Sequence, residues 1–189
     1  MKELSHSFSI LKQKLAMKKT LTTTVAIFIL TVVCSAQQDY SDKVQTLDST
    51  IETLYAVISG EAGEKRDWEL FKYLFTADAK LLPSGTDKEG KVVYRVMSPA
   101  EYEENAGAYL EENGFFEKEI YRVTETFGSM THIFSTYESY KSESDEEPFA
   151  RGINSIQLMN DGDRWWVVNI YWVPESEDLT IPEKYLPKG

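Results

Sequence analysis

Residues 149–173 read FARGINSIQLMNDGDRWWVVNIYWV and give the clearest structural signal in the chain. Two runs rich in β-branched and aromatic residues flank the segment Asn160-Asp161-Gly162-Asp163. An Asp-Gly pair tolerates the positive φ angles that a tight hairpin needs. The sequence therefore predicts a β-hairpin with strands over 149–159 and 164–173.

The faces of this hairpin follow from its register, and we place Met159 opposite Arg164 across the turn. Because side chains alternate along a strand, one face then carries Asn154 opposite Asn169, with Tyr171 nearby. A buried amide without a hydrogen bond costs about 1–3 kcal/mol. The two amides therefore bond either to each other or to backbone, or they line a pocket and orient a ligand.

Large apolar groups occupy both faces of the expected hairpin. We expect helices to cover one face and a second copy of the chain to cover the other, so the sequence predicts a homodimer. Two further strands are expected over 115–126 and 130–141, which are also rich in β-branched and aromatic residues.

Helices are expected mainly in the N-terminal half, over 47–58, from about 65 to 75, and over 98–113, where apolar residues or cap signals recur at helical spacing. Short strands are expected over 80–82 and 91–97. This order predicts an α+β domain in which three N-terminal helices pack on a curved antiparallel sheet, with the shape of a cone.

The stretch Leu74-Phe75-Thr76-Ala77-Asp78-Ala79 is similar to the end of the second helix in the nuclear transport factor 2-like superfamily, which includes ketosteroid isomerase and SnoaL-like cyclases. Residues 149–158 and 164–168 resemble the final hairpin of its small exported bacterial members. The resemblance covers 47–175 and implies the cone-shaped fold. The superfamily hosts isomerases, dehydratases, carriers and scaffolds, so the resemblance implies no single function.

Residues 1–36 have the character of a leader. Met17-Lys18-Lys19, an uncharged run from Leu21 to Val33, and the small residues Cys34-Ser35-Ala36 form the layout of a secretory signal peptide. We expect the true start at Met17, cleavage after Ala36, and a periplasmic or secreted protein. The apolar run is shorter than the ~20 residues of a membrane span. Val33 before Cys34 disfavours lipoprotein processing.

Residues 37–46 are expected to form a linker, 47–175 the domain and 176–189 a C-terminal tail. Cys34 is the one cysteine of the chain, so we expect no disulfide in the domain. The net charge of the chain is −11, and the leader carries five Lys and one Glu, so residues 37–189 carry −15. Such a charge repels phosphate backbones, and no nucleic-acid partner is expected.

Metal and cofactor chemistry are not expected. The chain has two histidines, His6 and His132, and His6 lies in the leader. One histidine without cysteine cannot build the usual zinc sites, and the acidic loop over 141–148 lacks the ligand spacing of a calcium loop. His132 is expected on a strand face with Met130 and Phe134, as a core residue or as a base.

Enzyme chemistry of the isomerase kind needs a carboxylate base and a hydrogen-bond donor in the pocket. The resemblance implies a base shortly after Ala79, where Lys80-Leu81-Leu82-Pro83-Ser84 has no carboxylate. It also implies that Tyr55 lies near the place of an oxyanion-hole tyrosine. We therefore assign no catalytic residue.

Our leading hypothesis is an exported, non-catalytic domain that binds a small, partly apolar molecule in the cone. One alternative is an isomerase, cyclase or dehydratase that uses His132 and Tyr55. Another is a dimeric interaction module with a filled cone. The expected pocket residues are Tyr55, His132, Asn154, Asn169 and Tyr171.

Overall fold

The computed structural model describes residues 38–188. The predictions of a signal peptide, of a start at Met17 and of processing at Cys34 or Ala36 fall outside the described residues. Within 38–188, no helix combines the length and the apolar character that crossing a membrane requires.

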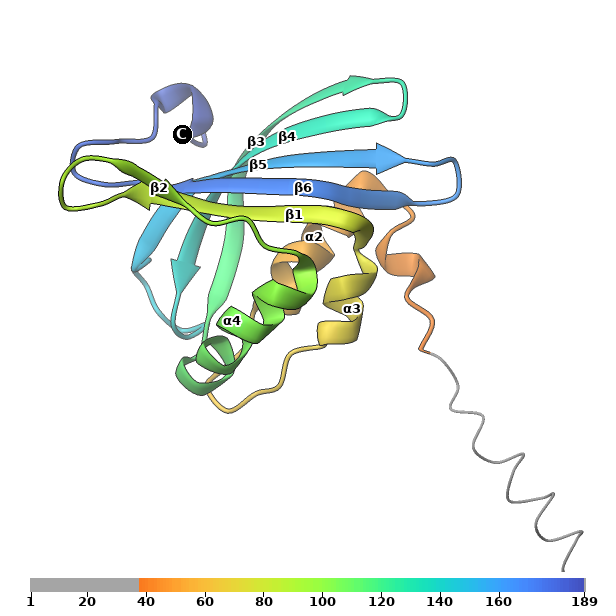
Figure 1. Cartoon of the computed structure of the whole chain (residues 1–189), viewed down its shortest axis with the longest axis horizontal. Helices are drawn as coiled ribbons and strands as arrows, with labels where there is room; N and C mark the ends of the chain where they lie inside the picture. Colours follow the sequence, from red (N-terminus) through yellow and green to blue (C-terminus); the bar gives the residue numbers. More distant parts are fainter. Residues whose placement is uncertain (1–37, 189) are drawn as a thin grey trace, which may run out of the picture. The chain divides into compact units, whose positions relative to one another are not determined.

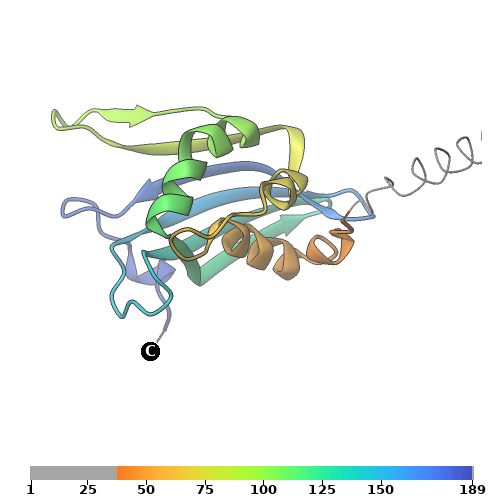
Figure 2. The same ribbon diagram turned by 90° about the horizontal axis from the view of Figure 1, so that it is seen from below.

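Three α-helices lie on one side of the fold (Figures 1 and 2), as the sequence predicts. They are α2 (Leu47–Ile58), α3 (Trp68–Tyr73) and α4 (Pro99–Asn113). The side chains of Thr46, Asp67 and Ser98 cap their first turns by accepting a backbone N–H. Two short 3₁₀ helices, η1 (Ser41–Lys43) and η2 (Glu183–Tyr185), flank the domain.

Six strands form one curved, open sheet in the order β2-β1-β6-β5-β4-β3. The last four strands form the antiparallel meander that the sequence predicts, and their bounds agree with the expected ones to within one residue. The strands are β1 (Phe75–Thr86), β2 (Val92–Tyr94), β3 (Phe116–Phe127), β4 (Met130–Tyr140), β5 (Ala150–Asn160) and β6 (Trp165–Pro174).

The prediction of a purely antiparallel sheet is wrong in one place, because β1 runs parallel to β6. The predicted second helix is also too long, since α3 ends at Tyr73 and β1 begins at Phe75. Phe75, Ala79 and Leu81 are buried as inward-facing strand residues, and Phe75 pairs with Val167 of β6. Leu74 therefore closes α3, and the rest of the stretch 74–79 opens a strand instead of continuing the helix.

The core lies between the helices and the concave face of the sheet (Figure 2), because both surfaces are apolar there. On the other face of the sheet, the C-terminal segment packs through Tyr185. Its ring lies 4.9 Å from that of Phe134, and its carbonyl accepts a hydrogen bond from Thr136 at 2.6 Å. Fully buried core residues include Ile51, Phe71, Leu74, Ile133, Ile156, Leu158 and Val167.

The predicted register of the final hairpin is wrong, because Met159 pairs with Trp166 and not with Arg164. The Asp161 carboxylate accepts the backbone N–H groups of Asp163 and Arg164, each at 2.9 Å, so Arg164 belongs to the turn. A bulge between Gln157 and Leu158 then shifts the pairing once more.

This shift separates the two amides that the sequence placed opposite each other. Asn154 pairs with Trp172, and Asn169 pairs with Gln157. Asn154 is buried on the inner face of the sheet, whereas Asn169 is only half-buried. The prediction of an Asn154/Asn169 pair is therefore wrong.

Candidate functional site

A cavity of about 260 Å³ lies between the helices and the inner face of the sheet. An apolar protein cavity of about 150 Å³ already binds benzene, so this one has room for a larger molecule. The cone is therefore not filled by its own side chains. Six of the 14 lining residues are aromatic: Tyr55, Phe71, Tyr102, Phe115, Tyr137 and Trp172.

Glu117, near the start of β3, brings a carboxyl group into this wall. The loop after α2 positions it, because Gly60 and Phe115 exchange two backbone hydrogen bonds of 2.8 and 3.0 Å. The backbone N–H of Glu117 also donates to Ser59 Oγ at 3.0 Å. The end of α2 thus fixes the point at which β3 enters the sheet.

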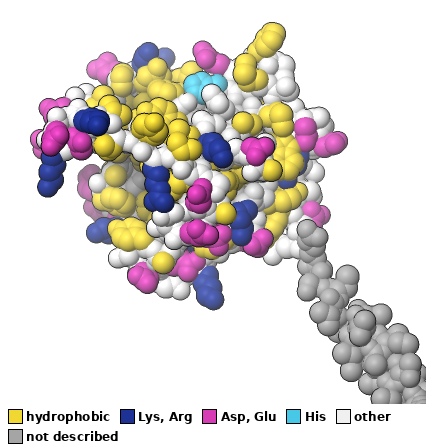
Figure 3. Space-filling view, in the orientation of Figure 1, with side chains coloured by type: hydrophobic (Ala, Val, Ile, Leu, Met, Phe, Trp, Pro, Cys, Tyr) yellow, Lys and Arg dark blue, Asp and Glu magenta, His cyan; other side chains and the backbone are white. Residues whose placement is uncertain are grey.

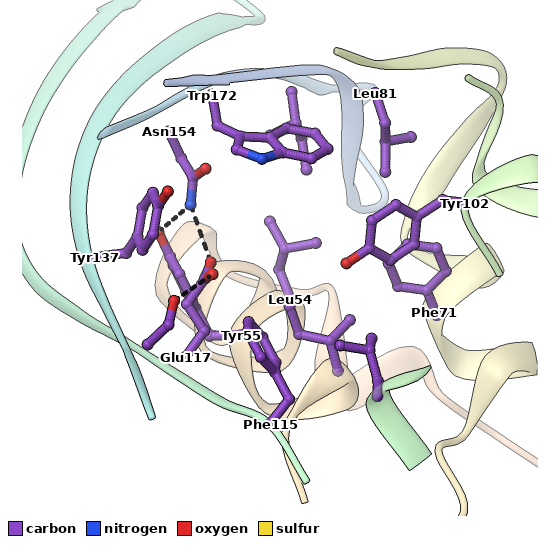
Figure 4. A pocket seen from close by; sticks show the side chains of 14 residues that line it. Leu54, Tyr55, Phe71, Leu81, Tyr102, Phe115, Glu117, Tyr137, Asn154 and Trp172 are labelled. Atoms are coloured by element: carbon purple, nitrogen blue, oxygen red, sulfur yellow. Dashed lines mark hydrogen bonds between the residues drawn. The ribbon is translucent and has the colours of Figure 1, made fainter. Parts of the chain in front are cut away.

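The Glu117 carboxyl accepts one hydrogen bond at each oxygen (Figure 4). Asn154 Nδ2 donates to Oε1 at 3.2 Å, and Ser139 Oγ donates to Oε2 at 3.3 Å. Burial raises the pKa of Glu117 to about 7, and these two hydrogen bonds offset only part of that rise. Within residues 38–188, no Lys, Arg or His lines the cavity, so nothing there neutralises the carboxylate.

A chain of hydrogen bonds runs from Glu117 into the core. Ser135 Oγ donates to Glu119 at 2.5 Å, and because a hydroxyl has one hydrogen, Ser135 must accept from Tyr55 at 2.7 Å. Tyr55 in turn accepts from Asn154 Nδ2 at 3.0 Å, and the second N–H of that amide serves Glu117. The Tyr55 hydrogen therefore points away from the cavity.

Arg122 holds the far end of this chain. Its Nε donates to Glu119 Oε2 at 2.7 Å, and its Nη1 donates to Asp48 Oδ1 at 2.7 Å. Asp48 is exposed in the first turn of α2. The orientation of the Asn154 amide is thus set by an ion-paired network that reaches the surface.

The opposite wall is aromatic (Figure 4). The Tyr102 ring stacks on Phe71 with ring centres 5.4 Å apart and meets the edge of Trp172 at 6.3 Å. The Tyr102 hydroxyl points into the cavity. Burial and the charge of Glu117 raise the pKa of Tyr102, so its hydroxyl remains a neutral donor.

Neither the known protein-family models nor the curated protein sequences match this sequence. Solved structures do match. A protein of unknown function from Mycobacterium tuberculosis has a TM-score of 0.53 at 13% identity, over 72% of this chain and 75% of that one. A Nostoc punctiforme protein of unknown function with a cystatin-like fold has a TM-score of 0.51 at 11% identity, over 69% and 90%.

A calcium/calmodulin-dependent protein kinase II association domain from Xanthomonas campestris also matches, with a TM-score of 0.50 at 14% identity over 69% of this chain and 86% of that one. The chain has the nuclear transport factor 2-like fold. The prediction made from the sequence is confirmed at this level, and identities this low establish the fold alone.

Within this nuclear transport factor 2-like fold, the structure brings Tyr55 and Asn154 together at the cavity. It does not bring His132, Asn169 or Tyr171 there, because none of them lines the cavity. The shifted register of β6 places Tyr171 on the outer face, where it is 40% exposed and accepts a hydrogen bond from Ser84.

His132 also lies on the outer face, since its neighbour Ile133 points inward and is fully buried. Its Nε2 lies 2.9 Å from Ser155 Oγ, and its ring lies 6.0 Å from that of Phe134. An enzyme that pairs His132 with Tyr55 is therefore excluded by geometry.

Glu117 lies in the cavity wall but was not predicted there from the sequence, and the same is true of Tyr102, Tyr137 and Trp172. Phe115 and Glu117 share a strand face by alternation, and they directly follow the expected end of a helix. An acidic residue beside an aromatic one on the inward face was thus a usable signal.

Proposed function

We propose that this protein binds a small, largely apolar molecule in the cavity, with Glu117 as the main polar contact. The observation that carries the proposal is a carboxyl group in an aromatic wall without a neutralising cation. Burying such a group lowers the stability of a fold. Perturbed carboxyl groups in concave apolar sites are typical of ligand-binding and catalytic centres.

Native mass spectrometry of the full chain, purified from its natural source, tests this proposal. We expect a small molecule to co-purify with the wild type and to be lost from Leu54→Trp, which fills the cavity from α2. Val93→Trp, at an exposed position of β2, is the matched control and should keep the molecule.

Leu110→Trp fills the same cavity from α4 and protects the test against a folding defect in the first variant. Circular dichroism checks that each variant is folded. Retention of the same mass by both folded cavity variants would contradict binding in this cavity.

General acid–base catalysis is a second candidate function, and the pKa of Glu117 favours it. A carboxyl with a pKa near 7 can both take and give a proton at neutral pH. We would then expect the wild type in D₂O to replace a carbon-bound hydrogen of the co-purified molecule with deuterium. Glu117→Gln should not catalyse this exchange. Absence of exchange with the wild type would favour simple binding.

The outer face of the sheet supports a further proposal, that the protein forms a homodimer. Hydrophobic side chains gather over the strands (Figure 3), and Phe127 and Met130 are 84% and 61% exposed. A second copy would cover such a surface. Sedimentation velocity should show a dimer for the wild type and a monomer for Met130→Lys. A monomeric wild type would overturn this proposal.

A further inference from the structure

The cavity holds one carboxyl group and no positive charge. Among the residues in 38–188 that line it, Glu117 is the only one with an ionisable carboxyl, and none is a Lys, Arg or His. Arg122 is bound to Glu119 and Asp48 at the far end of the hydrogen-bond chain. Residues 38–188 therefore place no counter-ion for an ionised Glu117 in the cavity wall, and a bound cation could supply it.

The rings around the cavity suit a cation. Aromatic faces carry negative electrostatic potential and attract ammonium groups within about 6 Å of the ring centre. Tyr102, Phe71 and Trp172 surround the open space that the Glu117 carboxyl faces (Figure 4). A carboxylate within an aromatic box offers a cation both an ion pair and ring faces.

The hydrogen bonds within the polar wall also favour a cationic ligand. Both N–H groups of Asn154 are used by Tyr55 and Glu117, and the Tyr55 hydrogen is used by Ser135. Asn154 and Tyr55 therefore have no free donor for a ligand, and the Glu117 carboxylate beside them offers acceptor oxygens. An ammonium group has donors and no acceptor, whereas an anionic ligand would be repelled there.

We propose that the ligand is a small amine whose ammonium group pairs with Glu117 and whose apolar part lies among the aromatic rings. This inference rests on the proposed binding function and narrows it to one chemical class. The net charge of −11 favours the approach of cations over that of anions.

The pairing makes binding depend on pH. The titratable groups that face Glu117 are Tyr55 of α2, Tyr102 of α4 and Tyr137 of β4, and burial raises the pKa of each tyrosine. Glu119 lies behind Ser135 and is paired with Arg122. Between pH 5 and 8, Glu117 is thus the group in the wall that changes charge.

Isothermal titration calorimetry of the full chain with 2-phenylethylamine and 2-phenylethanol tests the inference. The two probes share a ring and a chain length and differ in charge. At pH 8 we expect the wild type to bind the amine about tenfold more tightly than the alcohol. Between pH 8 and 5.5, protonation of Glu117 should weaken amine binding by about sevenfold, to nearly that of the alcohol, and leave alcohol binding unchanged.

Glu117→Gln should bind both probes equally, since it keeps the shape of the wall and removes its charge. Glu112→Gln removes an exposed carboxylate from α4 and should behave like the wild type. Equal binding of both probes by the wild type, unaffected by Glu117→Gln, would overturn the amine and leave the cavity as a binding site. Tighter binding of the alcohol than of the amine by the wild type would also overturn the amine and leave the cavity as a binding site. Binding of neither probe would count against both proposals.

Discussion

Glu117→Gln is expected to raise the free energy of unfolding above that of the wild type, and this gain should be about 2 kcal/mol larger at pH 8 than at pH 5. The pKa of Glu117 is raised by burial to about 7, above its ordinary value of 4.5. Between these two values the folded state binds more protons than the unfolded state. The contribution of Glu117 to the free energy of unfolding is therefore greatest below about pH 4.5 and decreases as the pH rises toward 7.

Urea denaturation of the wild type and Glu117→Gln at pH 5 and pH 8 measures this effect. Glu112→Gln carries the same change in net charge at an exposed position and controls for general repulsion in this acidic protein. A difference between wild type and Glu117→Gln that is the same at both pH values would show that Glu117 titrates normally.

Arg66→Ala is expected to lower the free energy of unfolding by about 3 kcal/mol. Arg66 is 7% exposed, and its guanidinium donates to four backbone carbonyls. These belong to Ile58 at the end of α2, to Glu64 and Gly60 in the following loop, and to Leu110 near the end of α4. Its loss would leave buried acceptors at two helix ends without hydrogen bonds.

Arg66→Lys should recover little of this stability, because an ammonium group cannot reach carbonyls spread around a planar guanidinium. Arg95→Ala is the matched control, since Arg95 is exposed, and it should change stability by less than about 0.5 kcal/mol. Thermal denaturation of the three variants gives the comparison. If Arg66→Ala were as mild as Arg95→Ala, the role given to Arg66 in joining the helix ends would be wrong.

Much of the fold was predictable from local pattern. The Asp161-Gly162 turn and the β-branched runs around it located β5 and β6, and Ser98 marked the start of α4. The parallel pairing of β1 with β6 was not predictable in this way, because the pattern within a strand does not identify its neighbours. The register failed for a related reason: the Asp161 carboxylate binds two backbone N–H groups and lengthens the turn.

The candidate site was only partly predictable. Tyr55 and Asn154 were expected at a pocket, and they lie there. The hydrogen bonds that join them to Ser135 and Glu117 connect four different elements of the fold. Such a network forms only when the sheet curves over the helices, so the hydrogen bonds of Glu117 could not be predicted from the sequence, although its place on the inward face of β3 could.

The most direct test of the account is an NMR titration of the full chain labelled with ¹³C at the glutamate side-chain carboxyl carbons. We expect one resonance with a midpoint near pH 7, and we expect it to be absent from Glu117→Gln. If every glutamate in the wild type titrated with a midpoint below about pH 5, near the ordinary value, Glu117 would be solvated like a surface carboxylate. The proposed site would then lose its basis.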